Sequence, residues 1–151
     1  MFNMKEIKIG NGFDVHKLTV GKKIKLCGIE IKHDKKLIGH SDADVGLHSL
    51  TDALLGALGR GDIGILFPPT ESKWKNADSG IFLNKALELM QKDKFLISNI
   101  DITFICEEPK ISQFREVMIK KLSGVCNVET KSINIKATTS EKLGFTGRKE
   151  G

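Results

Sequence analysis

Asp14, His16 and His48 are the residues whose types and spacing most clearly indicate chemistry. Asp14 and His16 lie at the end of residues 6–16, where apolar and charged residues alternate as they do in a strand. Alternate residues of an extended chain share a face, so the carboxylate and the imidazole should point the same way, about 7 Å apart at the backbone. Such a pair could bind one metal ion, or it could be an ordinary hydrogen-bonded pair at a strand end.

His48 lies within residues 39–62, which the sequence predicts to contain the main helix. Steps of four place Asp44, His48 and Asp52 on one stripe of that helix, while its leucines supply the apolar surface that docks it. A lone histidine on a helix is usually a core or surface residue. His48 becomes a metal candidate because a second pair of possible ligands precedes it in the chain.

Together, Asp14, His16 and His48 would give two nitrogen ligands and one oxygen ligand. This set leaves one position of a tetrahedral zinc ion open for a substrate oxygen, which favours a catalytic over a structural site. Asp44 and Asp52 flank His48, and either could accept a hydrogen bond from its ring and so orient it.

Length and composition favour a single domain over residues 1–151 with room for a hydrophobic core. Hydrophobic residues make up 40% of the chain, but their longest runs are too short to cross a bilayer, so we expect no membrane partner. The N-terminus resembles neither a secretion signal nor a transit leader, which predicts a cytoplasmic protein.

The net charge of +5 could serve nucleic acid or a phosphorylated small molecule. The lysines are spread along the chain, and one tryptophan with no tyrosine offers little for base stacking, so we expect no nucleic-acid partner. Cys27, Cys106 and Cys126 are widely spaced and fit reduced core thiols.

Hydrophobic period and turn residues predict the remaining elements. Strands are expected in a hairpin at Lys23–Leu26 and Ile29–Lys32, followed by a polar turn at 33–36, and at Ile97–Cys106 and Ile133–Ala137. Helices are expected after an N-cap at Ser41 or Asp42 up to Gly59, over 79–93 with Ser79 as cap, and over Ile111–Leu122 with Phe114, Val117, Met118 and Leu122 inward. We expect Gly10 and Gly12 to loosen the backbone before the polar pair.

Two loops could contact a ligand. The segment Thr70–Ser79 is polar, poorly patterned and carries Trp74 as its main apolar anchor, which predicts a lid. The strand ending near Ala137 leads into the hydroxyl-rich residues 138–142 and a glycine-flanked segment, 143–148. Hydroxyls, amides and an arginine around glycines suit a phosphate-binding turn.

Several long motifs occur in a characteristic order. They are Gly12–His16, His40–Val45 with His48, Thr51–Leu54, Gly61–Gly64 with Phe67-Pro68, Pro109-Lys110 and Lys136–Arg148. In these motifs the chain resembles the 2-C-methyl-D-erythritol 2,4-cyclodiphosphate synthase family of the non-mevalonate isoprenoid pathway, from Gly12 to the last residue.

The resemblance implies an α+β single domain, with a mainly antiparallel sheet packed by helices on one face, that assembles as a homotrimer with active sites between subunits. It implies that 4-diphosphocytidyl-2-C-methyl-D-erythritol 2-phosphate cyclises and expels CMP, which makes the enzyme a metal-dependent phosphorus-oxygen lyase. Zn2+ would bind to Asp14, His16 and His48, and Glu141 would bind Mg2+ or Mn2+ together with the substrate phosphates.

The resemblance also implies roles for other residues. His40 and Thr139 would act as catalytic residues that steady the transferring phosphoryl group. Phe145 and Arg148 would line an axial cavity that could take an isoprenoid diphosphate. The implied substrate contacts are Asp14, Val15, His16, His40, Ser41, Asp62, Ile63, Gly64, Phe67, Cys106, Pro109, Lys110, Thr138, Thr139, Ser140, Glu141, Phe145 and Arg148.

Two departures and two alternatives accompany the resemblance. Pro69 stands where relatives commonly have aspartate, and Glu107-Glu108 adds negative charge beside the implied cytidine pocket. The same three metal ligands could serve a zinc hydrolase of phosphate esters. A trimeric module that binds isoprenoid diphosphates through Arg148, with a structural zinc, is the non-enzymatic alternative.

Overall fold

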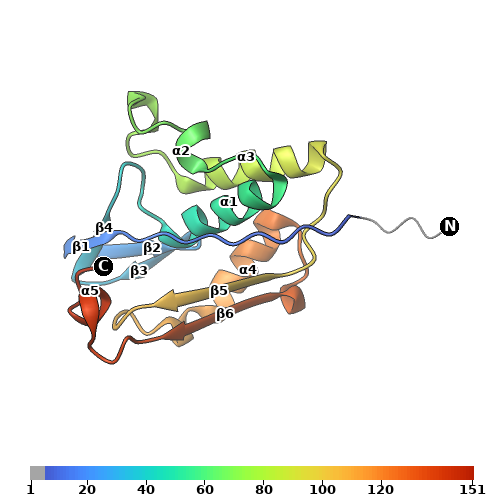
Figure 1. Ribbon diagram of the computed structural model, residues 1–151. Coiled ribbons are helices and arrows are strands. Elements are labelled where there is room, and N and C mark those ends of the chain that lie inside the picture. The colour runs from blue at the N-terminus through green and yellow to red at the C-terminus, as the bar shows by residue number, and fades with distance from the viewer. Residues whose placement is uncertain (1–5) are drawn as a thin grey trace.

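The computed structural model describes residues 6–151 as a small α+β domain (Figure 1). Its strands are β1 Lys17–Val20, β2 Lys23–Leu26, β3 Ile29–Lys32, β4 Lys35–Ile38, β5 Ile100–Ile105 and β6 Ile133–Thr138. Its α-helices are α1 Val45–Leu58, α2 Ile63–Leu66, α3 Ser79–Lys92, α4 Arg115–Cys126 and α5 Gly144–Gly147. Short 3-10 helices occupy Ser72–Trp74, Ile111–Gln113 and Thr130–Ser132.

The strands form three two-stranded ladders among the described residues. β1 pairs with β4 and β2 with β3 in antiparallel fashion, whereas β5 and β6 are parallel. The expected hairpin is confirmed, with Lys25 opposite Glu30, but the expected turn at 33–36 ends early because Lys35 already opens β4. The predicted antiparallel pairing is therefore correct for β1 to β4. It is wrong for β5 and β6, the parallel pair against which the helices pack.

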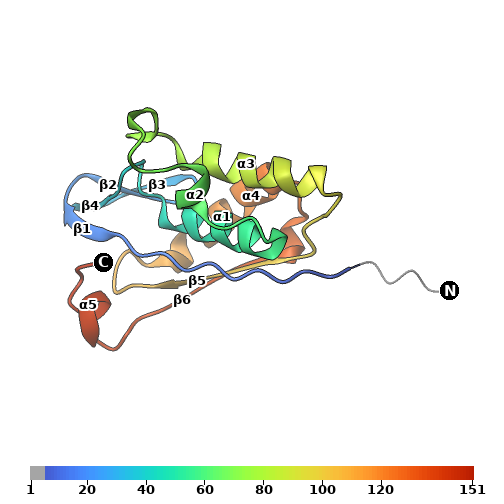
Figure 2. The same ribbon diagram turned by 45° about the horizontal axis from the view of Figure 1, so that its top comes forward.

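Helices α1, α3 and α4 lie on the same side of β5 and β6 (Figures 1 and 2). The core between these layers contains fully buried side chains from each of them, for example Leu83, Leu122 and Ile135. In α4 the sequence reasoning was wrong at one position, since Val117 is 54% exposed while Met118 and Leu122 are buried. Within residues 6–151 no helix is long and apolar enough to cross a membrane.

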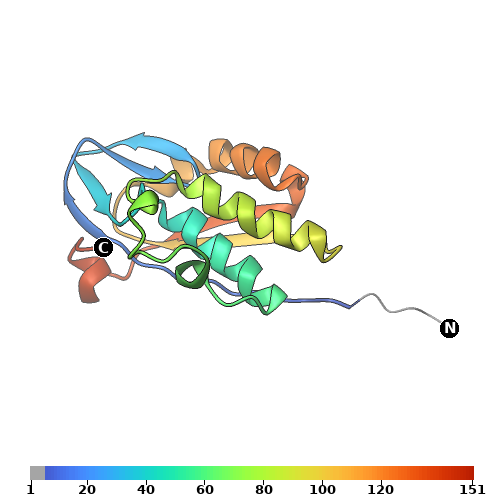
Figure 3. The same cartoon turned by 90° about the horizontal axis from the view of Figure 1, so that it is seen from above.

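Residues 6–16 are extended but do not form the predicted strand. The first strand, β1, begins only at Lys17. The segment instead runs along α1 (Figure 3). A Cβ atom at Gly10 would lie 1.8 Å from the backbone oxygen of Ala53, and one at Gly12 would lie 1.8 Å from that of Ser49. These glycines therefore allow the backbone to approach the helix closely, rather than loosening it as expected.

The main helix begins at Val45 with Asp44 as its N-cap, so the prediction of Ser41 or Asp42 was wrong. The Asp44 carboxylate is fully buried and accepts hydrogen bonds from the backbone amides of Leu47, Cys27 and Gly28, at 3.0, 2.8 and 2.6 Å. One carboxylate thus caps α1 and ties it to the turn of the β2–β3 hairpin.

The ends of α1 and α3 are otherwise close to expectation, whereas α4 spans Arg115–Cys126 instead of the expected Ile111–Leu122 because Ile111–Gln113 forms a separate 3-10 helix. Gly59 ends α1 in the left-handed conformation, with φ 67°, as its sequence predicts. The helix α3 ends at Lys92, one residue before the predicted end at 93, and Asp78 rather than Ser79 is its N-cap and accepts from the amide of Gly80. Ser79 is left free for another contact.

Candidate metal centre and its surroundings

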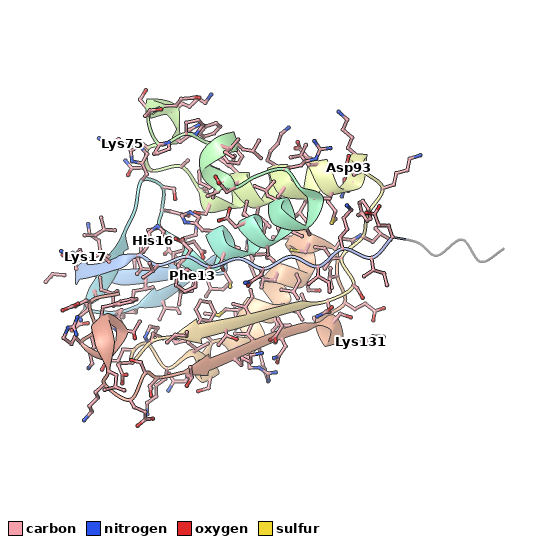
Figure 4. The ribbon with its side chains drawn as sticks, viewed as in Figure 1. Phe13, His16, Lys17, Lys75, Asp93 and Lys131 are labelled. Carbon is pink, nitrogen blue, oxygen red and sulfur yellow. The ribbon has the colours of Figure 1, made fainter. Side chains whose placement is uncertain are left out.

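Asp14, His16 and His48 converge on one point, as their residue types predicted. Their ligand atoms all lie within 4.8 Å of one another. The Asp14 Oδ2 atom is 3.1 Å from Nδ1 of His16 and 3.1 Å from Nδ1 of His48. The extended segment carries the first two residues with alternate side chains turned inward, and α1 carries the third; Figure 4 labels His16 at this junction.

The electrostatics of this cluster suit a cation. Partial burial would raise the pKa of Asp14, but the adjacent imidazoles of His16 and His48 outweigh it and hold that pKa well below its usual range. The His16 Nδ1 atom is buried and, within the described chain, has no aligned hydrogen-bond partner. An orphaned imidazole nitrogen beside an ionised carboxylate and a second imidazole nitrogen is a donor set that Zn2+ prefers, so these residues fit a zinc ion.

The far side of the His48 ring contacts two hydroxyls, and neither was predicted to do so. Its Nε2 atom lies 2.8 Å from Oγ of Ser79 and 2.9 Å from Oγ of Ser41. The expectation that Asp44 or Asp52 orients this ring was wrong. Asp44 caps α1, and Asp52 accepts from the amide of Ile63 at 2.8 Å.

The segment 70–79 lies beside the cluster and is better anchored than its sequence indicated. Trp74 packs edge-on against Phe67 and Phe82, with ring centroids 5.0 and 5.9 Å apart. Two backbone hydrogen bonds join the segment to the loop before α1. The amide of Asn76 donates to the carbonyl oxygen of His40 at 2.8 Å, and the amide of Asp42 donates to the carbonyl oxygen of Ala77 at 3.0 Å. The side chain of His40 is exposed.

The residues before α2 lie next to α1. The Asp62 carboxylate accepts from the amide of Ile65 at 3.0 Å, and the amide of Ile63 is held by Asp52. Asp62 and Gly64 are exposed, whereas Ile63 and Phe67 are partly buried. Asp52 thus holds the exposed start of α2 against α1, the helix that carries His48.

A cavity of about 300 Å³ extends from Asp14 and His16, two of the three candidate metal ligands, to β5. One wall is the segment Gly12–His16, which contributes Asp14, Val15 and His16. The other wall comes from β5 and the chain end, with Cys106, Pro109 and Phe145 among its residues. Six of the expected substrate contacts thus line one cavity.

Other expected contacts lie on the turn after β6. Thr138, Thr139 and Glu141 are exposed and, among residues 6–151, Thr139 and Glu141 neither join the metal cluster nor line the cavity. The Thr139 hydroxyl is 3.4 Å from Oε1 of Glu141. Glu141 and Lys142 both adopt the left-handed conformation, with φ 52° and 63°.

Glu107 supports this turn from the end of β5. Its Oε1 atom accepts from the backbone amides of Ser140 and Lys142, each at 3.3 Å. Of the two extra negative charges noted in the sequence, that of Glu107 is thus directed at backbone donors, and that of Glu108 pairs with Nζ of Lys149 at 2.8 Å. Lys110 is exposed, and Arg148 makes two hydrogen bonds with Glu150, at 2.9 and 3.0 Å.

Fold and site together define a small α+β domain that could hold a metal ion through two imidazoles and a carboxylate. The model of the YgbB family matches residues 7–151, and the chain belongs to this family.

Named relatives agree with this assignment. A protein of Cereibacter sphaeroides named 2-C-methyl-D-erythritol 2,4-cyclodiphosphate synthase is 52% identical over 146 residues, which are 97% of this chain and 92% of the relative. The resemblance noted in the motifs is therefore confirmed. A bifunctional enzyme IspD/IspF of Paracoccus denitrificans is 54% identical over 97% of this chain, which spans 38% of the length of that relative.

A solved structure agrees in fold as well as in sequence. The structure described as the CDP complex of IspF from Plasmodium falciparum is 41% identical, with a TM-score of 0.84. The match covers 95% of this chain and 88% of the other.

Proposed function

We propose that this chain cyclises 4-diphosphocytidyl-2-C-methyl-D-erythritol 2-phosphate to 2-C-methyl-D-erythritol 2,4-cyclodiphosphate and releases CMP. The observation that carries the proposal is the convergence of Asp14, His16 and His48 in a chain 52% identical to a protein named for this activity. The reaction needs charge neutralisation and alignment rather than a protein nucleophile, because the 2-phosphate of the substrate itself attacks the β-phosphorus.

Each part of the site would have one task. Asp14, His16 and His48 would hold Zn2+, which supplies a Lewis acid that polarises a phosphate oxygen. Glu141 would hold Mg2+ or Mn2+ with the substrate phosphates, since an exposed carboxylate is a ligand that hard cations prefer. His40 and Thr139 would steady the transferring phosphoryl group. Ser41 and the residues Asp62–Gly64 would bind the methylerythritol end.

The cytidine end would bind near the end of β5. Cys106, Pro109 and Lys110 would form this pocket with Thr138, and the ligand named for the Plasmodium falciparum structure supports a cytidine diphosphate group. The cavity that joins Asp14 to Cys106 and Pro109 supports a cyclase over a general hydrolase, because a hydrolase needs no nucleoside pocket.

A homotrimer with active sites between subunits would complete the site. Two observations support this assembly. Thr139 and Glu141 lie outside the metal cluster of their own chain. Phe13 and Leu143 are 75% and 72% exposed, as are other apolar side chains of the N-terminal segment, so a second copy has apolar surface to cover. Phe145 and Arg148 would then face an axial cavity suited to an isoprenoid diphosphate.

The test follows both products of the reaction. The purified protein, which we propose is a single domain over residues 1–151, is incubated with the substrate in water labelled with 18O. Phosphorus NMR and mass spectrometry then identify CMP and the second product. A cyclic diphosphate without solvent oxygen is expected from the wild type, and neither product from His48→Ala. A linear phosphate that carries 18O would instead identify a hydrolase and overturn the proposal.

A further inference from the structure

Lys25 joins three parts of the fold that meet near the metal cluster, and none of the roles above uses it. It lies on β2 between Ile24 and Leu26, whose side chains are buried in the core. Its Nζ atom donates to Oδ2 of Asp42, in the loop between β4 and α1, at 2.6 Å. The same atom donates to Oδ2 of Asp78, the N-cap of α3, at 2.7 Å. One ammonium group therefore holds two carboxylates from different elements against an anchored strand.

The two ion pairs of Lys25 differ in strength. Lys25 and Asp42 are both partly buried, so solvent screens their attraction only in part. The side chain of Asp78 is 61% exposed, and an ion pair at that exposure contributes little. A charge-assisted hydrogen bond is also stronger than a neutral one. The hydrogen bond from Lys25 to Asp42 is therefore the contact that holds the loop.

The middle of the loop 39–44 needs a tether, because its backbone is strained. Ala43 adopts the left-handed conformation, with φ 59°, which is unfavourable for a residue with a side chain. Such strain persists only where surrounding contacts fix the backbone. Asp44 fixes the end of the loop as the cap of α1. The middle depends on Asp42, whose Oδ2 atom accepts both from the ammonium group and from the amide of Ser79 at 3.2 Å.

The tethered loop carries two of the proposed substrate contacts. It lies beside the segment that leads into α3 (Figures 1 and 3). Ser41 directly precedes Asp42, and its hydroxyl lies 2.9 Å from Nε2 of His48 and 3.3 Å from Oγ of Ser79. The side chain of His40 is exposed on the same loop. Neither His40 nor Ser41 can keep its place if Asp42 moves.

We propose that Lys25 is a positioning residue that preorganises the loop 39–44 for substrate by holding Asp42. The proposal rests on the proposed function, because the loop matters as the place of His40 and Ser41. Without the tether the loop would adopt other conformations in the free protein. A substrate that binds only the ordered loop loses apparent affinity in proportion to the population of that state, whereas the complex, once formed, is unchanged. The loss of Lys25 should therefore raise KM and leave kcat nearly constant.

Lys25→Met tests the tether, because methionine keeps an unbranched side chain of similar length and removes the ammonium group. We expect KM for 4-diphosphocytidyl-2-C-methyl-D-erythritol 2-phosphate to rise about 10-fold or more, and kcat to change by less than about twofold. A variant that merely folds less well would instead show a lower kcat per total protein and an unchanged KM. Lys25→Arg should return KM to within about threefold of the wild type, because a guanidinium also binds two carboxylates.

Trp74 reports the same change without substrate. The chain has one tryptophan and no tyrosine, so its fluorescence comes from the segment 70–79, which is hydrogen-bonded to the loop 39–44. The packing of Trp74 against two phenylalanine rings limits its contact with a quencher. We expect acrylamide to quench the fluorescence with a constant about twofold or more higher in Lys25→Met than in the wild type, and Lys25→Arg to reverse this rise.

Lys23→Met is the matched control. Lys23 lies on the same strand, two residues before Lys25, and its Nζ atom pairs with Glu30 of β3 rather than with the loop. Both side chains of this pair are exposed, so its loss should change little. KM, kcat and the quenching constant should stay at their wild-type values. Circular dichroism and thermal unfolding check that each variant folds.

Four outcomes would overturn the proposal. They are wild-type KM and quenching in folded Lys25→Met, a lower kcat with unchanged KM in that variant, no recovery in Lys25→Arg, and an equal rise of KM in Lys23→Met. The fluorescence measurement needs no substrate. A wild-type protein that forms no cyclic product would refute the proposed function, while the quenching of Trp74 in the same set of variants would still decide whether Lys25 holds the loop.

Discussion

Gly12→Ala tests whether the fit of the N-terminal segment against α1 sets the position of Asp14. A Cβ atom at residue 12 would lie 1.8 Å from the backbone oxygen of Ser49 and 2.9 Å from the backbone nitrogen of Ala53. Helix backbone atoms cannot rotate away, so the segment must withdraw by about 1.5 Å to reach ordinary contact distance. Asp14 lies two residues further along and must move with it.

The size of the effect follows from that displacement. A misplacement of about 1 Å at a reacting site costs about 100-fold in rate, and overpacking costs about 1–3 kcal/mol of stability. We expect Gly12→Ala to lower kcat/KM for CMP release by about 100-fold or more, to weaken zinc binding, and to lower the free energy of unfolding by about 1–3 kcal/mol. Steady-state kinetics, chelator competition and urea unfolding measure the three quantities.

Gly56→Ala supplies the control on the same helix. A Cβ atom there meets nothing within 4 Å, and alanine is favoured over glycine in a helix interior by about 0.5–1 kcal/mol. This variant should be slightly more stable and fully active. Wild-type zinc affinity and kcat/KM in Gly12→Ala would refute the claim that close packing at this glycine positions the metal ligands.

Glu141→Gln should keep its zinc but lose the dependence of turnover on Mg2+ or Mn2+, because an amide is a poor ligand for a hard cation; an unchanged divalent-ion titration would contradict this. We expect residues 70–79 to exchange amide hydrogens fast without substrate and slowly with it, and Trp74→Ala to remove that protection; equal exchange in both states would exclude a lid. Burial raises the pKa of the Cys126 thiol from 9.0 to about 11, so the unfolded chain ionises first and stability falls as pH rises through this window. Urea unfolding at pH about 8 and 10.5 should show a smaller decline in Cys126→Ala, and an equal decline would contradict the shift.

The metal ligands were predictable because their chemistry is local. An Asp-x-His pair in an extended segment and a histidine on an amphipathic helix restrict each side chain to one face, and the structure confirms both faces. The strand assignment for residues 6–16 failed for a different reason. Ile7 and Ile9, whose alternation with charged residues predicted a strand, are 87% and 90% exposed, and the segment approaches α1 through Gly10 and Gly12 instead of pairing with a strand.

The contacts that the sequence did not predict depend on residues far apart in the chain. Ser79 contacts His48 across 31 positions, and as a serine at a helix start it resembles a cap. Asp44 caps α1 because the amides of Cys27 and Gly28 reach it, whereas Ser41 and Asp42 have equal local propensity. Local preference offers several equivalent choices in such cases, and tertiary hydrogen bonds decide among them.

The left-handed turn at Glu141 and Lys142 has a consequence for attempts to make this protein more heat-resistant. Each non-glycine residue in that conformation costs about 1–2 kcal/mol, so glycine at either position would raise the melting temperature. At Lys142 the gain would be free of a functional penalty, because Glu107 holds that residue through its backbone amide. At Glu141 the same change would remove the carboxylate that we propose as a ligand of the second cation. Thermal stability and the proposed catalysis would then compete at Glu141 but not at Lys142.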